Sequence, residues 1–125
     1  MLDVSAERLD IDVQRGQALL EGDVQATLGD LAVRCSRVEI RYDESPRIEW
    51  VKASGAVSVK LKGIEATSST LEVDMPKRIA VLTGNVRLAR GRGWVTAERA
   101  KLEMATGKVT LESVKGEIPV EPPAR

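Results

Sequence analysis

The sequence offers few side chains that could carry out chemistry. It contains no histidine and a single cysteine, Cys35. The missing histidine removes the commonest general base and the commonest metal ligand. One cysteine can form neither an intramolecular disulfide nor a Cys-rich zinc site, and without histidine to activate it we expect a buried, unreactive thiol. We therefore expect no catalytic residue, no metal site and no cofactor.

Carboxylates are the remaining candidates, since paired acids can hydrolyse glycosidic bonds. Six of them alternate with apolar residues: Asp10, Asp12, Glu39, Glu72, Asp74 and Glu103. A spacing of two residues places side chains on one face of a β-strand. Arg8, Arg37 and Arg99 are available as cross-strand partners for them. We expect a solvated outer face, so the chain is predicted not to be an enzyme.

The elements that carry these residues are predicted from two interleaved repeats. One repeat is Gly-x-Val or Gly-x-Ile, at Gly22, Gly55, Gly84 and Gly116. The other is a small residue, two polar residues and then alternating apolar positions, beginning at Ala6, Cys35, Ser68 and Ala97. The two motifs alternate four times in a fixed order, which predicts four units of about 30 residues.

Composition and hydrophobic period predict an all-β chain. There are 28 Val, Ile and Thr residues among 125, no Phe, and equal numbers of acidic and basic residues. The apolar residues alternate with polar ones, as in half-buried strands, and no 3.6-residue period appears. A zero net charge argues against broad electrostatic binding of nucleic acid or anionic lipid, for which an excess of basic residues is expected. Turn signals divide the chain into eight long strands, at about 4–13, 17–28, 31–42, 47–61, 64–75, 78–89, 94–104 and 108–120.

The glycine inside every second strand predicts a bend or bulge that divides the long strand in two. We expect one domain over residues 1–120 and a Pro-rich, disordered tail over residues 121–125. No apolar run is long enough for a membrane-spanning helix, and no basic-then-apolar leader begins at Met1. The chain is thus expected to be cytoplasmic or the mature form of an exported protein.

The repeat resembles the OstA-like family, to which the lipopolysaccharide-transport protein LptA belongs. The residues that carry the resemblance are 5–12, 16–24, 96–99 and, most sharply, Val81-Leu82-Thr83-Gly84-Asn85-Val86-Arg87-Leu88. The pattern covers the chain from Val4 to Val120. The resemblance implies an incompletely closed antiparallel β-jelly roll, a twisted slot between two sheets, and a periplasmic location. It also implies a non-enzymatic carrier of lipopolysaccharide, or a related multi-acyl lipid, toward the outer membrane.

The inner faces of the predicted strands supply the candidate lipid-binding residues, because an apolar slot would gain about 0.8 kcal/mol for each acyl CH2 that it buries. They are Leu9, Ile11, Val13, Leu20, Val24, Ala26, Leu28, Val38, Ile40, Val57, Val59, Leu71, Val73, Leu82, Val86, Leu88, Leu102 and Met104. The alternative is that these side chains pack together and leave no slot.

The first and last strands are the candidate partner edges, through Val4, Ala6, Arg8, Val114, Ile118 and Val120. Pro119 departs from an ideal pairing edge. The resemblance implies LptC-like and LptD-like jelly-roll domains as partners, and head-to-tail stacking of copies. A structural filament or adaptor that assembles through these edges without bound lipid is the alternative function.

Three further features have two readings each. The basic cluster Arg87, Arg90, Arg92 and Arg99 is either a solvated loop or a contact for lipid A phosphates or a partner's acidic rim. Trp50 and Trp94 are each either core or rim aromatics, or wedges at the mouth of the slot.

Overall fold

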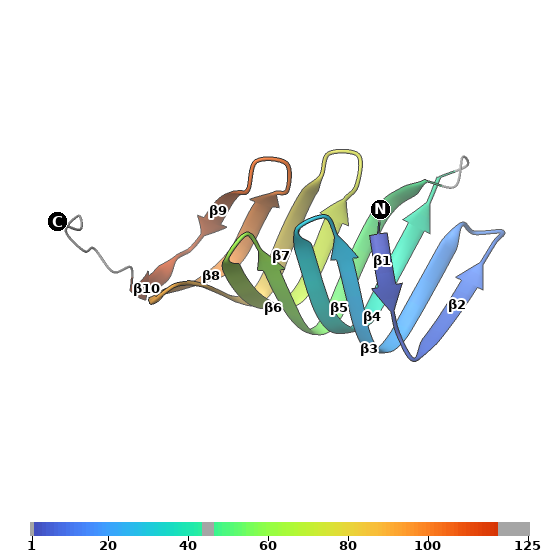
Figure 1. Cartoon of the computed structure of the whole chain (residues 1–125), viewed down its shortest axis with the longest axis horizontal. Coiled ribbons are helices and arrows are strands. Elements are labelled where there is room, and N and C mark those ends of the chain that lie inside the picture. The colour runs from blue at the N-terminus through green and yellow to red at the C-terminus, as the bar shows by residue number, and fades with distance from the viewer. Residues whose placement is uncertain (1, 44–46, 118–125) are drawn as a thin grey trace.

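The computed structural model describes residues 2–43 and 47–117, and in them it contains ten β-strands and no helix (Figure 1). No helix in these ranges could therefore cross a membrane. The strands are β1 (Leu2–Ser5), β2 (Arg8–Asp12), β3 (Gln17–Leu28), β4 (Leu31–Tyr42), β5 (Ile48–Leu61), β6 (Ile64–Asp74), β7 (Ile79–Arg90), β8 (Gly93–Glu103), β9 (Lys108–Glu112) and β10 (Lys115–Glu117).

All ten strands form one antiparallel sheet in chain order. The six long strands β3 to β8 pair with their neighbours, β1 and β2 both pair with β3, and β9 and β10 both pair with β8. Up-and-down connection by short turns explains the order, because each turn returns the chain beside the strand it has just left. In the described ranges, the sheet does not close on itself, so β1 and β2 form one edge and β9 and β10 form the other.

Each long strand bends near its middle, which divides the sheet into two halves. The pairing register shifts at this level, between Glu21 and Val24 in β3, Ser54 and Val57 in β5, and Thr83 and Val86 in β7. We call the half that contains β1 and β10 half A, and the half that contains β2 and β9 half B. In Figure 1 the two halves face each other and are joined along the lower edge.

Glycine is required at the bend because a neighbouring side chain lies where a β-carbon would be. A β-carbon on Gly55 would lie 2.7 Å from Cβ of Ser36, and one on Gly84 would lie 2.7 Å from Cβ of Ser69. In the same way, a β-carbon on Gly22 would lie 2.8 Å from Cβ of Glu7. The two predicted repeats therefore meet in space, since each glycine is packed against the second residue of the other motif.

The fourth copy of the glycine motif was predicted wrongly. Gly116 lies in β10, in regular register with Val95, and its φ is not positive. The interruption between β9 and β10 comes at Ser113, whose φ is 57°. Ser113 follows Glu112, which pairs with Arg99 just as Glu21 pairs with Arg8, so the bend is three residues earlier than the motif suggested.

The other strand boundaries agree with the prediction within a residue or two. The predicted division at Gly22, Gly55 and Gly84 was wrong, because β3, β5 and β7 continue through a bulge, whereas the first and last predicted strands are each interrupted. The first predicted strand is interrupted at Ala6-Glu7 and ends at Asp12, so Val13 is in a turn. The backbone N–H of Glu7 donates a 2.9 Å hydrogen bond to the carbonyl oxygen of Gly22, which holds the interruption at the bend. Residues 118–125, with the predicted tail and Pro119, lie outside the described residues.

Candidate functional site

The inner faces of the two halves meet in a single apolar core. Side chains of both halves contribute to it, among them Val24 and Val57 near the bend and Leu71 and Leu102 in half B, all at most 2% exposed. Toward the mouth, an apolar cavity of about 30 Å³ remains between the halves. It is lined from half A by Val4, Ala26, Leu28, Leu31 and Val33, and from half B by Val38, Val51, Ala53, Leu71, Val73 and Met75.

The structure divides the eighteen predicted slot residues into three groups. Eleven are buried: Leu20, Val24, Val38, Ile40, Val57, Val59, Leu71, Val73, Leu82, Val86 and Leu102. Four are half-buried: Ala26, Leu28, Leu88 and Met104. Three are exposed: Leu9, Ile11 and Val13. Besides Val4, which was assigned to an edge, the cavity is lined by five residues that the prediction omitted: Leu31, Val33, Val51, Ala53 and Met75. Val51 and Ala53 share the parity of Val57, and Met75 shares that of Leu71 and Val73 in the predicted strand 64–75, so these three were detectable.

The three exposed residues mark an open end of the slot. Leu9 pairs with Leu20 and Ile11 pairs with Ala18, so both belong to the inner row of half B. They are nevertheless 54% and 62% exposed, because β2 is the last strand of half B at this end. Exposed apolar side chains that continue a buried row indicate a surface that can be extended by another apolar group.

The predicted edges are present in the structure as far as it describes them. Val4 and Val114 are 42% and 47% exposed, Ala6 is half-buried, and Arg8 begins β2. Ile118 and Val120 lie outside the described residues. Each edge presents two short strands, β1 with β2 and β10 with β9, and short edge strands limit unspecific pairing.

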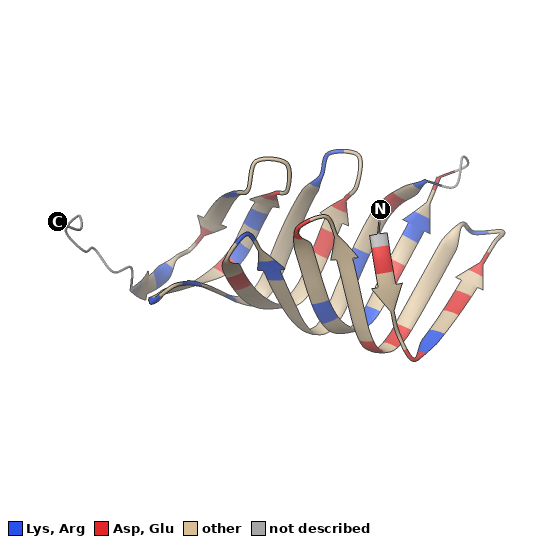
Figure 2. Ribbon diagram, in the orientation of Figure 1, with Lys and Arg blue, Asp and Glu red and all other residues tan. Residues whose placement is uncertain are grey.

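Charged residues are spread along all the long strands (Figure 2), and none of the six predicted outer-face carboxylates is buried. Arg8 is 3.0 Å from Asp10 and Arg37 is 3.2 Å from Glu39, so these ion pairs run along one strand and not across two. Their side chains are about half exposed or more, and such pairs contribute only about 0–1 kcal/mol. Within the described ranges, no group of three His, Cys, Asp or Glu residues could hold a metal ion.

The two tryptophans are neither core residues nor wedges in the slot. Each lies half-buried on an outer face: the guanidinium of Arg41 is 4.9 Å from the Trp50 ring, and that of Arg87 is 5.5 Å from the Trp94 ring. Cation–π contact and the arginine stems cover the rings in place of core packing. The predicted basic cluster is dispersed, because Arg87 and Arg99 lie on the outer faces of different halves, while Arg90 ends β7 and Arg92 is in the β7–β8 turn.

Cys35 is buried, as expected. Burial raises the pKa of its thiol above the usual 9.0, and hydrogen bonds with the backbone of Arg37 and Ser54 oppose the rise. The thiol donates to the carbonyl oxygen of Arg37 at 3.4 Å. This environment favours the neutral, unreactive form.

These features define a class of protein: an open, bent antiparallel sheet with an apolar interior, charged outer faces and, among the described strands, edges that pair on one side only. A family comparison assigns residues 3–108 to "LptA/(LptD N-terminal domain) LPS transport protein". The chain therefore belongs to the LptA/LptD N-terminal domain family of lipopolysaccharide-transport proteins, which confirms the predicted family and its jelly-roll fold.

Solved structures with the same fold include LptH from Pseudomonas aeruginosa, described as the LptA-homologous periplasmic component of the lipopolysaccharide transport device. The TM-score is 0.85 at 16% sequence identity, and the match covers 96% of each chain. No curated protein sequence matches the chain.

Proposed function

We propose that this chain is a periplasmic, non-enzymatic carrier that holds acyl chains of lipopolysaccharide, or of a related multi-acyl lipid, between its two half-sheets. The observation that supports the proposal is the apolar interior: the cavity is lined only by Val, Leu, Ala and Met side chains from both halves, and the row continues to the exposed Leu9 and Ile11. Acyl chains are recognised by such surfaces through buried area alone.

A cavity of about 30 Å³ has room for about one methylene group or one water molecule, so a lipid enters by separating the halves. In the described ranges, no strand pairing joins the halves across the mouth, since all pairing follows the sheet through the bend. Opening therefore breaks side-chain contacts but no backbone ladder. Each acyl CH2 group that takes the place of those contacts contributes about 0.8 kcal/mol of favourable binding free energy, from which the cost of ordering the acyl chain is subtracted.

The same proposal includes partners at the sheet edges: LptC-like and LptD-like jelly-roll domains, and a second copy of this chain. The eight strands of half B alternate in direction, so β9 of one copy placed beside β2 of the next is antiparallel to it. Such a head-to-tail contact is heterologous and can repeat without closing. It would place Val109 and Leu111 beside Ile11 and Leu9, and the apolar interior would continue from copy to copy.

The pairing rows of half B support one register for this contact. In half B, residues that are register partners on successive strands form rows across the sheet. One such row joins Arg8 on β2 to Glu112 on β9 through every strand between them, and another joins Asp12 to Lys108. If each row of directly opposed residues continues without a shift from one copy to the next, Glu112 of one copy lies opposite Arg8 of the other, and Lys108 lies opposite Asp12. Both pairs have opposite charge, and directly opposed charges of opposite sign favour a register by a few tenths of a kcal/mol each.

Native mass spectrometry tests the carrier function. The protein is purified without detergent from a lipopolysaccharide-producing envelope, as wild type, Ala26→Phe and Thr27→Phe. Ala26 lines the cavity, whereas its neighbour Thr27 is exposed on the outer face of the same strand, so the second variant is a matched control. We expect lipid A-containing species with the wild type and Thr27→Phe, and their loss in Ala26→Phe.

Lipid-free protein that also ignores added lipopolysaccharide would contradict the carrier proposal. Concentration-dependent assembly of that lipid-free protein would instead support the filament or adaptor function. Far-ultraviolet circular dichroism and thermal unfolding of each variant show whether a loss of lipid reflects a blocked slot or an unfolded chain.

A further inference from the structure

The mouth of the slot narrows where a lysine of half A reaches a glycine of half B. Lys62 is in the β5–β6 turn and Gly107 is in the β8–β9 turn. A β-carbon on Gly107 would lie 3.4 Å from Cδ and 3.8 Å from Nζ of Lys62. The stem of Lys62 therefore crosses the mouth and rests on backbone that has no side chain of its own.

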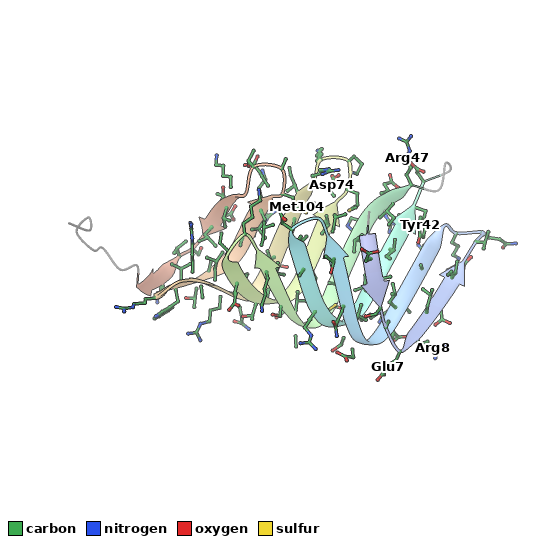
Figure 3. The ribbon with its side chains drawn as sticks, in the orientation of Figure 1. Glu7, Arg8, Tyr42, Arg47, Asp74 and Met104 are labelled. Atoms are coloured by element: carbon green, nitrogen blue, oxygen red, sulfur yellow. The ribbon has the colours of Figure 1, made fainter. Side chains whose placement is uncertain are left out.

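A second cation lies on the same side of the mouth. The backbone N–H of Met104 donates a 3.0 Å hydrogen bond to the carbonyl oxygen of Arg78, which joins the β6–β7 turn to the start of the β8–β9 turn. Figure 3 shows Asp74, which ends β6, and Met104, which begins the β8–β9 turn, toward the upper edge of the molecule and opposite the bend at Glu7. Figure 2 shows basic residues at the β6–β7 turn.

Both cations are available to a ligand. Lys62 and Arg78 are exposed, and none of the ion pairs among the described residues involves either of them. Lys60, two residues before Lys62, is different: it lies on the outer face of β5 at 3.6 Å from Glu65. Two acidic residues share a surface depression with Lys62: Glu65, which pairs with Lys60, and Asp30 in the β3–β4 turn.

We propose that Lys62 and Arg78 form an anion site at the mouth of the slot, which takes the phosphate group of an amphiphile whose acyl chain lies between the half-sheets. The inference rests on the proposed carrier function. An amphiphile with its tail in an apolar slot presents its head group at the mouth, so a cation held there meets it without a further ordering cost. Lysine suits this position because its stem covers apolar surface while the ammonium stays in water.

The backbone conformations of Lys62 and Arg78 allow each charge to be removed by a substitution that keeps the turn. The φ of Lys62 is 48° and that of Arg78 is 55°, a region in which asparagine is better tolerated than most residues. Asparagine before Gly63 is also a favoured pair in a two-residue hairpin turn. Lys62→Asn and Arg78→Asn thus remove the charges without disturbing the turns, and Lys60→Asn is the matched control.

The experiment is calorimetric titration of each protein with tetradecyl phosphate and with tetradecyl maltoside, which share a tail and differ in the charge of the head group. We expect Lys62→Asn and Arg78→Asn each to weaken binding of the phosphate amphiphile by about three- to tenfold, in line with about 1 kcal/mol for a charge-assisted contact. Maltoside binding and the Lys60→Asn protein should be unchanged. Added salt should weaken phosphate binding to the wild type more than to either rim variant.

Equal affinity of wild type and both rim variants for the phosphate amphiphile would overturn the anion site while leaving the carrier function intact. Failure of the wild type to bind either amphiphile would overturn the carrier proposal as well. Inorganic phosphate alone is expected to give no measurable heat, because the site depends on the tail. Saturable binding of inorganic phosphate would contradict that dependence and indicate a free-anion site.

Discussion

Gly84 and Ser69 face each other at the bend so closely that a β-carbon on Gly84 would lie 2.7 Å from both Cβ and Oγ of Ser69. The φ of Gly84 is 83°, in the left-handed region. The glycine is thus required twice, once by the backbone conformation and once by the neighbouring strand. The same pairing at Gly55 and Ser36 explains how a repeat in the sequence becomes a continuous bend across the sheet.

The first prediction separates these two requirements. Gly84→Ala should lower the free energy of unfolding by about 2–4 kcal/mol, from the strained backbone and the overlap with Ser69 together. Gly63→Ala is the control, because Gly63 has nearly the same φ, 82°, but nothing within 4 Å of a β-carbon. It should cost about 1–2 kcal/mol from the backbone alone. Equal losses for the two variants in urea unfolding would show that the contact with Ser69 does not matter.

Cys35 and Ser68 occupy the same place in successive repeats and serve the same backbone function. The Cys35 thiol donates to the carbonyl oxygen of Arg37 at 3.4 Å, and the Ser68 hydroxyl donates to that of Thr70 at 2.9 Å. Both side chains are buried, and each satisfies a carbonyl group two residues along the strand, beside the bend. This equivalence makes serine the natural replacement for Cys35.

The second prediction concerns the pH dependence of stability. Because burial raises the pKa of Cys35, the neutral thiol persists in the folded chain after the unfolded chain begins to ionise near pH 9.0. The stabilisation is therefore complete below that pH and decreases as pH rises above it. In urea unfolding between pH 7 and 10.5, the wild type should lose stability relative to Cys35→Ser. Parallel curves for the two proteins would contradict the prediction, and rapid labelling of the native thiol at pH 8 would contradict its burial.

The third prediction follows from the positions of the tryptophans. Trp50 and Trp94 lie on outer faces beneath Arg41 and Arg87, so an acyl chain in the slot is separated from both rings by the sheet. A lipid with brominated acyl chains should therefore leave the tryptophan fluorescence of the wild type unquenched. Leu28→Trp places a ring at the cavity and should be quenched by the same lipid. Quenching of the wild type would indicate that lipid binds to an outer face.

The sequence was sufficient for the strands and for the inner faces, and insufficient for the ends of the slot. Strand boundaries were predictable because turn residues and a period of two residues are local properties, and Val24 and Val57 are buried where parity placed them. Leu9 has the same parity but is 54% exposed, since exposure at an edge depends on which strand comes next. Lys62 was not predicted because its contact with Gly107 depends on how the two halves lie across the mouth.

Trp50 shows a second limit of the same kind. Large aromatic residues near strand starts are usually core or rim residues, but this ring lies on the outer face, where Arg41 on the adjacent strand covers it. Trp50 has the opposite parity to Val51 and Ala53, so alternation along the strand was sufficient to place it on the outer face. Its contact with Arg41 was not predictable, because it depends on the register between β4 and β5.

The last prediction tests the register of the proposed head-to-tail contact. Arg8→Glu and Glu112→Arg each place like charges opposite one another at the proposed junction and should shift assembly to higher protein concentration in sedimentation velocity, by about two- to fivefold.

The double variant Arg8→Glu/Glu112→Arg restores opposite charges at the junction and should assemble as the wild type does. Within one chain, Arg8 lies 3.0 Å from Asp10 and opposite Glu21 in the strand register, and Glu112 lies opposite Arg99, so each substitution also changes exposed charge contacts. Such contacts contribute little, and the double variant changes both sets of them. Recovery of assembly therefore has to come from the contact between copies. If the double variant instead assembles more weakly than either single variant, the register that places Glu112 opposite Arg8 is wrong. The edges would then bind a different partner.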